Sequence, residues 1–119
     1  MRVTWSLPLK LVSRCNARGH WRGQHQRDKN ARGLARMMTN RALTDARFAW
    51  NLQNSLRITI TRIGKNKRPI DSDNLPACSK AIRDGIADEL ECDDGDHRLE
   101  WVYQQRRGEY GVEVVIEEL

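Results

Sequence analysis

Residues 1–119 have the length of one domain, enough for a modest hydrophobic core. No stretch approaches the roughly 20 apolar residues of a membrane span, and no apolar run follows Arg2 as in a signal peptide, so we expect a soluble, cytoplasmic protein. The net charge is +5, but residues 1–70 hold 16 lysines and arginines against two aspartates, whereas residues 71–119 hold five against 14 acidic residues.

The first segments predict a strand, a basic loop and a helix. Apolar residues alternate from Val3 to Leu11, which is the period of a strand, and Pro8 places that strand at an edge or a bulge. The stretch SRCNARGHWRGQ (13–24) is rich in arginine, glycine and asparagine and is expected to be a loop. From about Gln26 to Thr44 the apolar residues recur at helical spacing.

The second half predicts a strand, a helix and two further strands. LRITITRI (56–63) alternates like a half-buried strand, and GKNKRP (64–69) is a basic loop. A second helix is expected from about Asn74 to Leu90. The alternating stretches RLEWVYQQ and EYGVEVVIEE are expected to form an antiparallel hairpin around RRGE. The order strand, helix, strand, helix, strand, strand predicts one α+β domain, with two main helices packed on a small mixed sheet.

Two aspartates, Asp71 and Asp73, directly follow the basic loop and precede the second predicted helix. At 100° per residue, Lys80 and Asp84 fall on the same stripe of that helix as Asp73, apart from its apolar face. Helix capping would account for one of the first carboxylates, and an i,i+4 salt bridge would account for Lys80 and Asp84. A purely structural role for these residues therefore remains an alternative.

A divalent cation would explain why carboxylates lie beside a strongly basic half, because carboxylates alone repel phosphate. One aspartate of the loop CDDGD, Asp93 or Asp94, would complete a magnesium site with the Asp-x-Asp pair, since Mg²⁺ accepts a few carboxylates together with waters and phosphate oxygens. A calcium loop is excluded, because its sixth position would be Pro76 and its twelfth Ile82. A solvated basic surface without a partner is the other interpretation of the charge.

The three cysteines, Cys15, Cys78 and Cys92, are odd in number and widely spaced, so we expect reduced thiols. Cys15 does not form a common zinc finger with His20 and His25, because the spacing is wrong and a fourth ligand is missing. Zinc is therefore not expected.

The acidic region resembles the RusA family of Holliday junction resolvases. The resemblance is carried by DSDN (71–74), by Lys80 followed four residues later by DG (84–85), and by DD (93–94), and the order of elements also agrees. It implies a homodimeric crossover junction endodeoxyribonuclease that uses Mg²⁺, with Mn²⁺ as an alternative ion. Such an enzyme cuts two strands of a four-way DNA junction symmetrically in recombination and repair. Many members come from phages or prophages, which implies a bacterial setting.

The resemblance also implies roles for individual residues. By position, Asp71 and Asp73 match the metal-binding D-x-D carboxylates, and Lys80 matches the catalytic lysine. One of Asp94 and Asp93, with Asp94 preferred, completes the metal and catalytic site. Some members place the lysine three residues after the asparagine, where this chain has an alanine, but Lys80 keeps its four-residue spacing to DG.

Basic side chains upstream of the acidic region are expected to hold the arms of the junction through their phosphates, so recognition would be mainly of DNA shape. Trp21 would either stack on an unpaired base at the crossover or pack in the core or an interface. The expected phosphate contacts are Arg14, Arg18, Arg22, Arg27, Lys29, Arg32, Arg36, Lys65, Lys67 and Arg68.

Three other functions remain open. The chain could be a non-catalytic branched-DNA-binding protein of the same fold, or a metal-dependent nuclease that acts on flaps or duplex. It could also be an interaction protein whose carboxylates only cap a helix.

Overall fold

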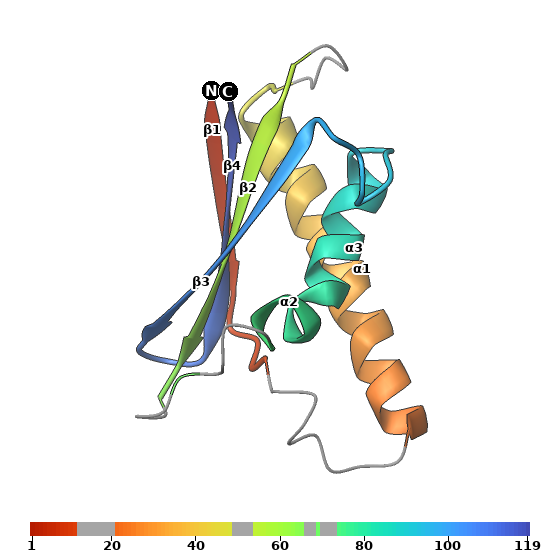
Figure 1. Ribbon diagram of the computed structural model, residues 1–119, viewed down its shortest axis with the longest axis vertical. Helices are drawn as coiled ribbons and strands as arrows, with labels where there is room; N and C mark the ends of the chain where they lie inside the picture. Colours follow the sequence, from red (N-terminus) through yellow and green to blue (C-terminus); the bar gives the residue numbers. More distant parts are fainter. Residues whose placement is uncertain (12–20, 49–53, 66–68, 70–73) are drawn as a thin grey trace.

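The computed structural model describes residues 1–11, 21–48, 54–65, 69 and 74–119, apart from the side chains of Trp21, Arg22 and Gln24. They form a mixed four-stranded sheet with all helices on one side (Figure 1), which confirms the predicted α+β class. The strands are β1 (Arg2–Leu7), β2 (Leu56–Gly64), β3 (Leu99–Arg107) and β4 (Gly111–Glu118), and the helices are α1 (Trp21–Asp45), α2 (Leu75–Cys78) and α3 (Lys80–Glu89). None of the helices in these described ranges combines the length and apolar composition needed to cross a bilayer.

The sheet has the strand order β1-β4-β2-β3, so the predicted hairpin of the last two strands is wrong. β2 lies between them, parallel to β3 and antiparallel to β4. The burial of each strand explains this order. β4 is buried at most positions, including Val112, Val114 and Ile116, and therefore occupies the interior of the sheet, whereas β3 exposes Glu100 and Arg106 and lies at the edge.

Two predicted boundaries also differ from the structure. β1 ends at Leu7 rather than Leu11, because Pro8 cannot donate to a ladder and the N–H of Leu9 instead bonds the carbonyl of Leu7 at 2.8 Å. α1 begins at Trp21, five residues before the predicted start, so that Trp21 belongs to a helix and not to a loop.

The second predicted helix is divided at Ser79 into α2 and α3, where the backbone has φ −97° and ψ 0°. Its predicted apolar stripe is nevertheless confirmed as a buried face. That stripe packs against the sheet and consists of Leu75, Cys78, Ile82, Ile86 and Leu90.

α1 packs against both β1 and α3. Trp5, which is buried on β1, donates its indole N–H to the hydroxyl of Thr39 on α1 at 3.1 Å. α3 approaches α1 so closely that a Cβ atom on Gly85 would lie 2.3 Å from the carbonyl oxygen of Arg32 and 2.8 Å from the Cβ atom of Ala35. Only glycine fits there, so the DG sequence (84–85) has a packing reason in this fold.

Candidate active site

A polar hollow of about 400 Å³ lies between the first half of α1 and the start of α3. Inside it, the ammonium of Lys80 lies 3.3 Å from a carboxylate oxygen of Asp84, which confirms the predicted i,i+4 pair. The Lys80 side chain is 61% exposed, so this ion pair is worth little and the ammonium is available to an incoming phosphate. The hollow is lined by His25, Asp28, Lys29, Arg32, Lys80, Ala81 and Asp84.

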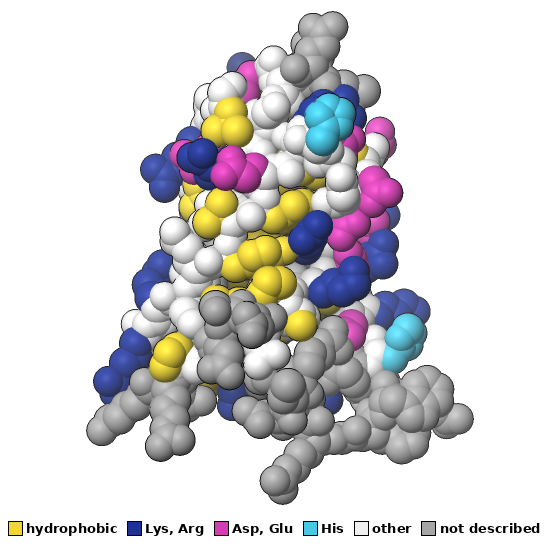
Figure 2. All heavy atoms as spheres, in the orientation of Figure 1, with side chains coloured by type: hydrophobic (Ala, Val, Ile, Leu, Met, Phe, Trp, Pro, Cys, Tyr) yellow, Lys and Arg dark blue, Asp and Glu magenta, His cyan; other side chains and the backbone are white. Residues whose placement is uncertain are grey.

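Cations of α1 meet carboxylates of α3 beyond this hollow. Arg32 binds Asp88 through two hydrogen bonds of 2.6 and 2.8 Å, and these bonds hold the pKa of Asp88 below its usual range. Arg36 lies 3.4 Å from Glu89, which also accepts a hydrogen bond from Asn40. Figure 2 shows the resulting alternation of basic and acidic side chains on the helical side of the molecule.

The basic residues of α1 that were predicted to contact DNA differ in their surroundings. Arg32 and Arg36 already face carboxylates, so a phosphate would compete for them. Arg27 and Lys29 lie exposed nearer the start of α1. Of the other predicted contacts, Lys65 lies 3.0 Å from Glu109, and this hydrogen bond raises the pKa of Lys65.

The loop after α3 folds back along the helix, because Arg83 holds it. The guanidinium of Arg83 donates to the backbone carbonyl of Asp94 at 3.0 Å and to the hydroxyl of Tyr103 at 2.7 Å, and it stacks 4.9 Å from the Trp101 ring centre. The indole N–H of Trp101 bonds the same Asp94 carbonyl at 2.8 Å. We call Arg83, Tyr103 and Trp101 the loop clamp. It anchors the loop that carries the DD pair at Arg83, which lies three residues after Lys80 on α3.

The two candidates for the third carboxylate have different surroundings. One Asp94 oxygen lies 3.1 Å from Nε of Arg83, at ion-pair distance, although the Nε–H makes no hydrogen bond to it. Asp93 is exposed and accepts the backbone N–H of Gly95 at 3.2 Å, which lowers the pKa of Asp93 and keeps it ionised. Asp93 is therefore the more available oxygen donor, although Asp94 was preferred from the sequence.

Several predicted residues lie outside the described part of the chain, so the predicted meeting of Asp71 and Asp73 with the DD pair stays a prediction. Within the described ranges, no group of three or more histidine, cysteine, aspartate and glutamate side chains is placed to hold a metal ion. The predicted residues outside the description are Asp71, Asp73, Arg14, Arg18, Lys67, Arg68 and the side chain of Arg22.

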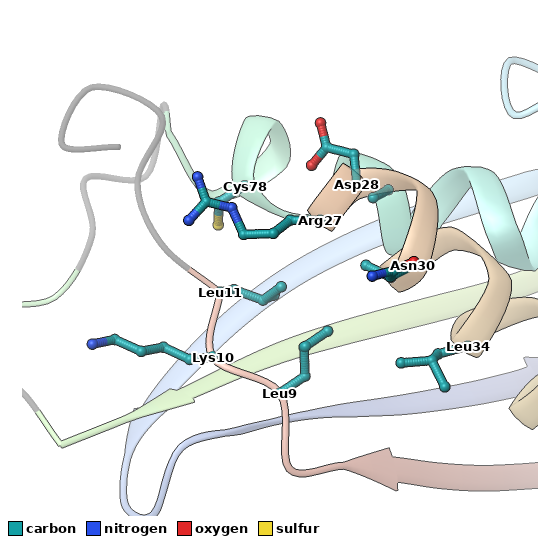
Figure 3. Close-up of a pocket in the computed structure, with 10 residues that line it drawn as sticks. Leu9, Lys10, Leu11, Arg27, Asp28, Asn30, Leu34 and Cys78 are labelled. Atoms are coloured by element: carbon teal, nitrogen blue, oxygen red, sulfur yellow. The ribbon is translucent and has the colours of Figure 1, made fainter. Parts of the chain in front are cut away.

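An apolar hollow of about 310 Å³ adjoins the polar one and shares Asp28 and Ala81 with it. Leu9, Leu11 and Leu34 extend into this space, and Lys10 and Arg27 lie at its rim (Figure 3). A flat apolar group attached to a phosphate would find both an apolar surface and a cation here.

Comparison with known proteins identifies a relative of unknown function. A protein of Xylella fastidiosa, described as uncharacterized, is 36% identical over 92 residues. The match covers 77% of this chain and 59% of the relative, so the chain spans about three fifths of that protein's length. No protein-family model matches the sequence.

The loop clamp and the close approach at Gly85 were not predicted from the sequence. The clamp joins residues that are 7 to 20 positions apart, and only the fold of the loop brings them together. Gly85 gave a usable signal, because glycine interrupts the helix between two buried apolar positions, Ile82 and Ile86.

Proposed function

We propose that this protein is a magnesium-dependent, structure-selective DNA endonuclease that resolves four-way junctions by paired symmetric incisions, in recombination and repair. The observation that supports this best is the exposed Lys80 in a hollow beside Lys29 and Arg32. In sequence, Lys80 follows the Asp71–Asp73 pair by one short helix. The proposal includes action as a homodimer in the cytoplasm of a bacterial cell.

The donor set suits magnesium, because carboxylate oxygens are the ligands that this hard cation prefers, and Asp93 is an exposed, ionised example. Asp71, Asp73 and either Asp93 or Asp94 would hold the ion, which supplies Lewis-acid polarisation and an acidified water. Lys80 would donate to a phosphate oxygen as negative charge develops on it.

The remaining basic side chains would bind the arms of the junction. A four-way junction offers two equivalent phosphates, which suits a two-fold protein with two identical sites. Lys29 would contribute more than Arg32 and Arg36, because these two must first leave Asp88 and Glu89. The apolar hollow would receive an unstacked base at the crossover, with its phosphate near Lys10 or Arg27.

Lys80 and Lys29 line the same hollow but are expected to fail in different ways when replaced. Lys80→Met should lower the cleavage rate at saturating enzyme by about 100-fold, because it removes a donor to the reacting phosphate. Lys29→Met should weaken junction binding by about fivefold, through loss of one phosphate contact, and leave the saturated rate within about twofold. Single-turnover kinetics on a labelled junction separates the two effects. Equal changes in both variants would contradict the assigned roles.

One observation favours a second function. The carboxylate of Asp94 lies at ion-pair distance from Arg83, as in a purely structural contact. The second candidate is therefore a non-catalytic branched-DNA-binding protein, and a nuclease for flaps or duplex is the third.

Three labelled substrates distinguish these functions: a synthetic four-way junction, a flap and a linear duplex, each with protein and Mg²⁺. The proposal expects only the junction to be converted into nicked duplexes. Junction binding without cleavage would indicate a non-catalytic DNA-binding protein, and equal cutting of all three substrates would indicate a general nuclease. If the protein bound none of the substrates, the remaining role of the carboxylates would be to cap a helix.

A further inference from the structure

The loop after α3 is held by its main chain. Two donors from different elements meet at the backbone carbonyl oxygen of Asp94. These donors are the guanidinium of Arg83 on α3, at 3.0 Å, and the indole N–H of Trp101 on β3, at 2.8 Å. A carbonyl oxygen that accepts two hydrogen bonds uses both of its lone pairs. The backbone of Asp94 is therefore fixed from two sides, and the adjoining Asp93 is fixed with it.

The carboxylate of Asp94 is held less firmly by the same arginine. One of its oxygens lies 3.1 Å from Nε of Arg83, but that buried Nε–H has no hydrogen-bond partner among the described residues. Arg32 makes a different kind of pair, because it binds the carboxylate of Asp88 through two hydrogen bonds of 2.6 and 2.8 Å. Arg83 thus fixes the backbone of Asp94, while its Nε–H does not lock the orientation of the carboxylate.

The loop lies near the polar hollow. Arg83 follows Lys80 by three residues on α3, and residues three apart are neighbours on a helix surface. Arg32 lines the hollow, and its hydrogen bonds to Asp88 are the main cause that raises the pKa of Arg32. The charge of Asp94 adds to this effect, so Asp94 lies within electrostatic range of Arg32.

We infer that Arg83 is a positioning residue of the proposed metal site, which holds the backbone of Asp94 so that the DD pair (93–94) stays beside the helix that carries Lys80. The inference rests on the proposed function, because it requires a divalent ion at these aspartates. Residues that orient metal ligands through hydrogen bonds typically contribute 10- to 100-fold to metal affinity. A grip on the main chain suits this role, because it places the ligand and leaves its oxygens able to turn toward the ion.

Charge and positioning predict opposite results when Arg83 is lost. A guanidinium repels a divalent cation, so a neutral side chain at this position would strengthen metal binding if charge alone mattered. Loss of the grip on Asp94 would instead release the loop and weaken metal binding. The direction of the change in affinity therefore distinguishes a positioning residue from a nearby charge.

A titration with Mn²⁺, followed by electron paramagnetic resonance, measures this direction. Arg83→Met should raise the dissociation constant for Mn²⁺ by about tenfold. Trp101→Phe removes the second donor without changing any charge and should raise the constant by about threefold. The control is Arg57→Met, which removes a guanidinium that pairs with Glu100, and the constant should then stay within about twofold of that of the unchanged protein.

A double-mutant cycle tests whether Arg83 acts through the DD pair. Of Asp93→Asn and Asp94→Asn, the one that weakens Mn²⁺ binding serves as the background. Adding Arg83→Met to it should change the affinity by less than about twofold, because the carboxylate that Arg83 positions is already gone. A further tenfold loss would contradict action through that carboxylate.

Hydrogen exchange without metal gives a readout that does not depend on the ion. The N–H groups of Gly95 and Asp96 both bond to Asp93 within the loop, at 3.2 and 3.0 Å. Their exchange should be about tenfold faster in Arg83→Met, whereas the exchange of amides in α1 should not change. Circular dichroism verifies the fold of each variant, and if Arg83→Met is unfolded, Trp101→Phe decides by the same measurements.

The inference is overturned if the folded Arg83→Met variant binds Mn²⁺ as tightly as the unchanged protein or more tightly, or if exchange in the loop is unchanged. If the unchanged protein binds no Mn²⁺, the inference and the proposed function fail together. Mn²⁺ binding that depends on Arg83, without any junction cleavage, would contradict the proposed function alone.

Discussion

Asp73→Asn is expected to slow junction cleavage by on the order of 1000-fold or more while junction binding stays the same or tightens. Asparagine keeps the shape of the side chain but removes the charge that would bind Mg²⁺. It also removes a negative charge that repels phosphate, so affinity should not fall. Single-turnover cleavage and a mobility-shift titration, both on the same labelled junction, measure the two quantities separately.

Asp45→Asn is the matched control for this variant. It makes the same chemical change at an exposed position in the last turn of α1, and neither cleavage nor binding should respond. Asp71→Asn should behave as Asp73→Asn does. Weaker junction binding by either variant would contradict the proposal that these carboxylates face the scissile phosphate. Unchanged cleavage would show that they take no part in the reaction.

Gly85→Ala is expected to destabilise the fold by about 3 kcal/mol, although alanine is the better helix former by roughly 1 kcal/mol. The added methyl group would lie 2.3 Å from the carbonyl oxygen of Arg32, which is backbone and cannot rotate away. α1 must therefore move away from α3. Urea unfolding followed by circular dichroism measures the loss of unfolding free energy.

Gly33→Ala is the control, because a methyl group at Gly33 meets no atom within 4 Å. Gly33 lies in the middle of α1, so alanine there should stabilise the protein by up to about 1 kcal/mol. The opposite signs at two helical glycines would show that close helix packing dominates at Gly85. Equal stabilisation by both variants would contradict that packing.

The parts of the fold that follow from periodicity were predictable. Alternation in β2 correctly predicted that Leu56, Ile58 and Ile60 are buried, and helical spacing correctly predicted the apolar stripe of α2 and α3. The neighbours of β3 and β4 were not predictable in this way, because a period of two shows which face is buried but not which strand lies beside it. The consecutive apolar residues VVI (114–116) in β4 were the available sequence signal for an interior strand, which is buried on both faces.

The start of α1 at Trp21 could not be predicted, for a different reason. Residues 22–30 contain no apolar residue, so this part of the helix has no hydrophobic periodicity. The first apolar residue after Trp21 is Ala31, which is buried. The sequence therefore predicted a loop up to Gln24 and a helix only from about Gln26.

The candidate site was predictable only where the interaction is local. The pair of Lys80 and Asp84 follows from helical spacing. The contacts of Arg32 with Asp88 and of Arg83 with Asp94 join separate elements, and their partners depend on how the helices and the loop pack. For that reason the sequence could not show that Arg32 and Asp94 are already engaged.

A titration with Mn²⁺, followed by electron paramagnetic resonance, tests most directly whether the aspartates bind a divalent ion. The protein should bind Mn²⁺, Asp73→Asn should abolish that binding, and Asp93→Asn or Asp94→Asn should weaken it according to which of them is the third ligand. Asp45→Asn should bind as the unchanged protein does. Equal Mn²⁺ affinity in all of these variants would contradict a metal site formed by these aspartates.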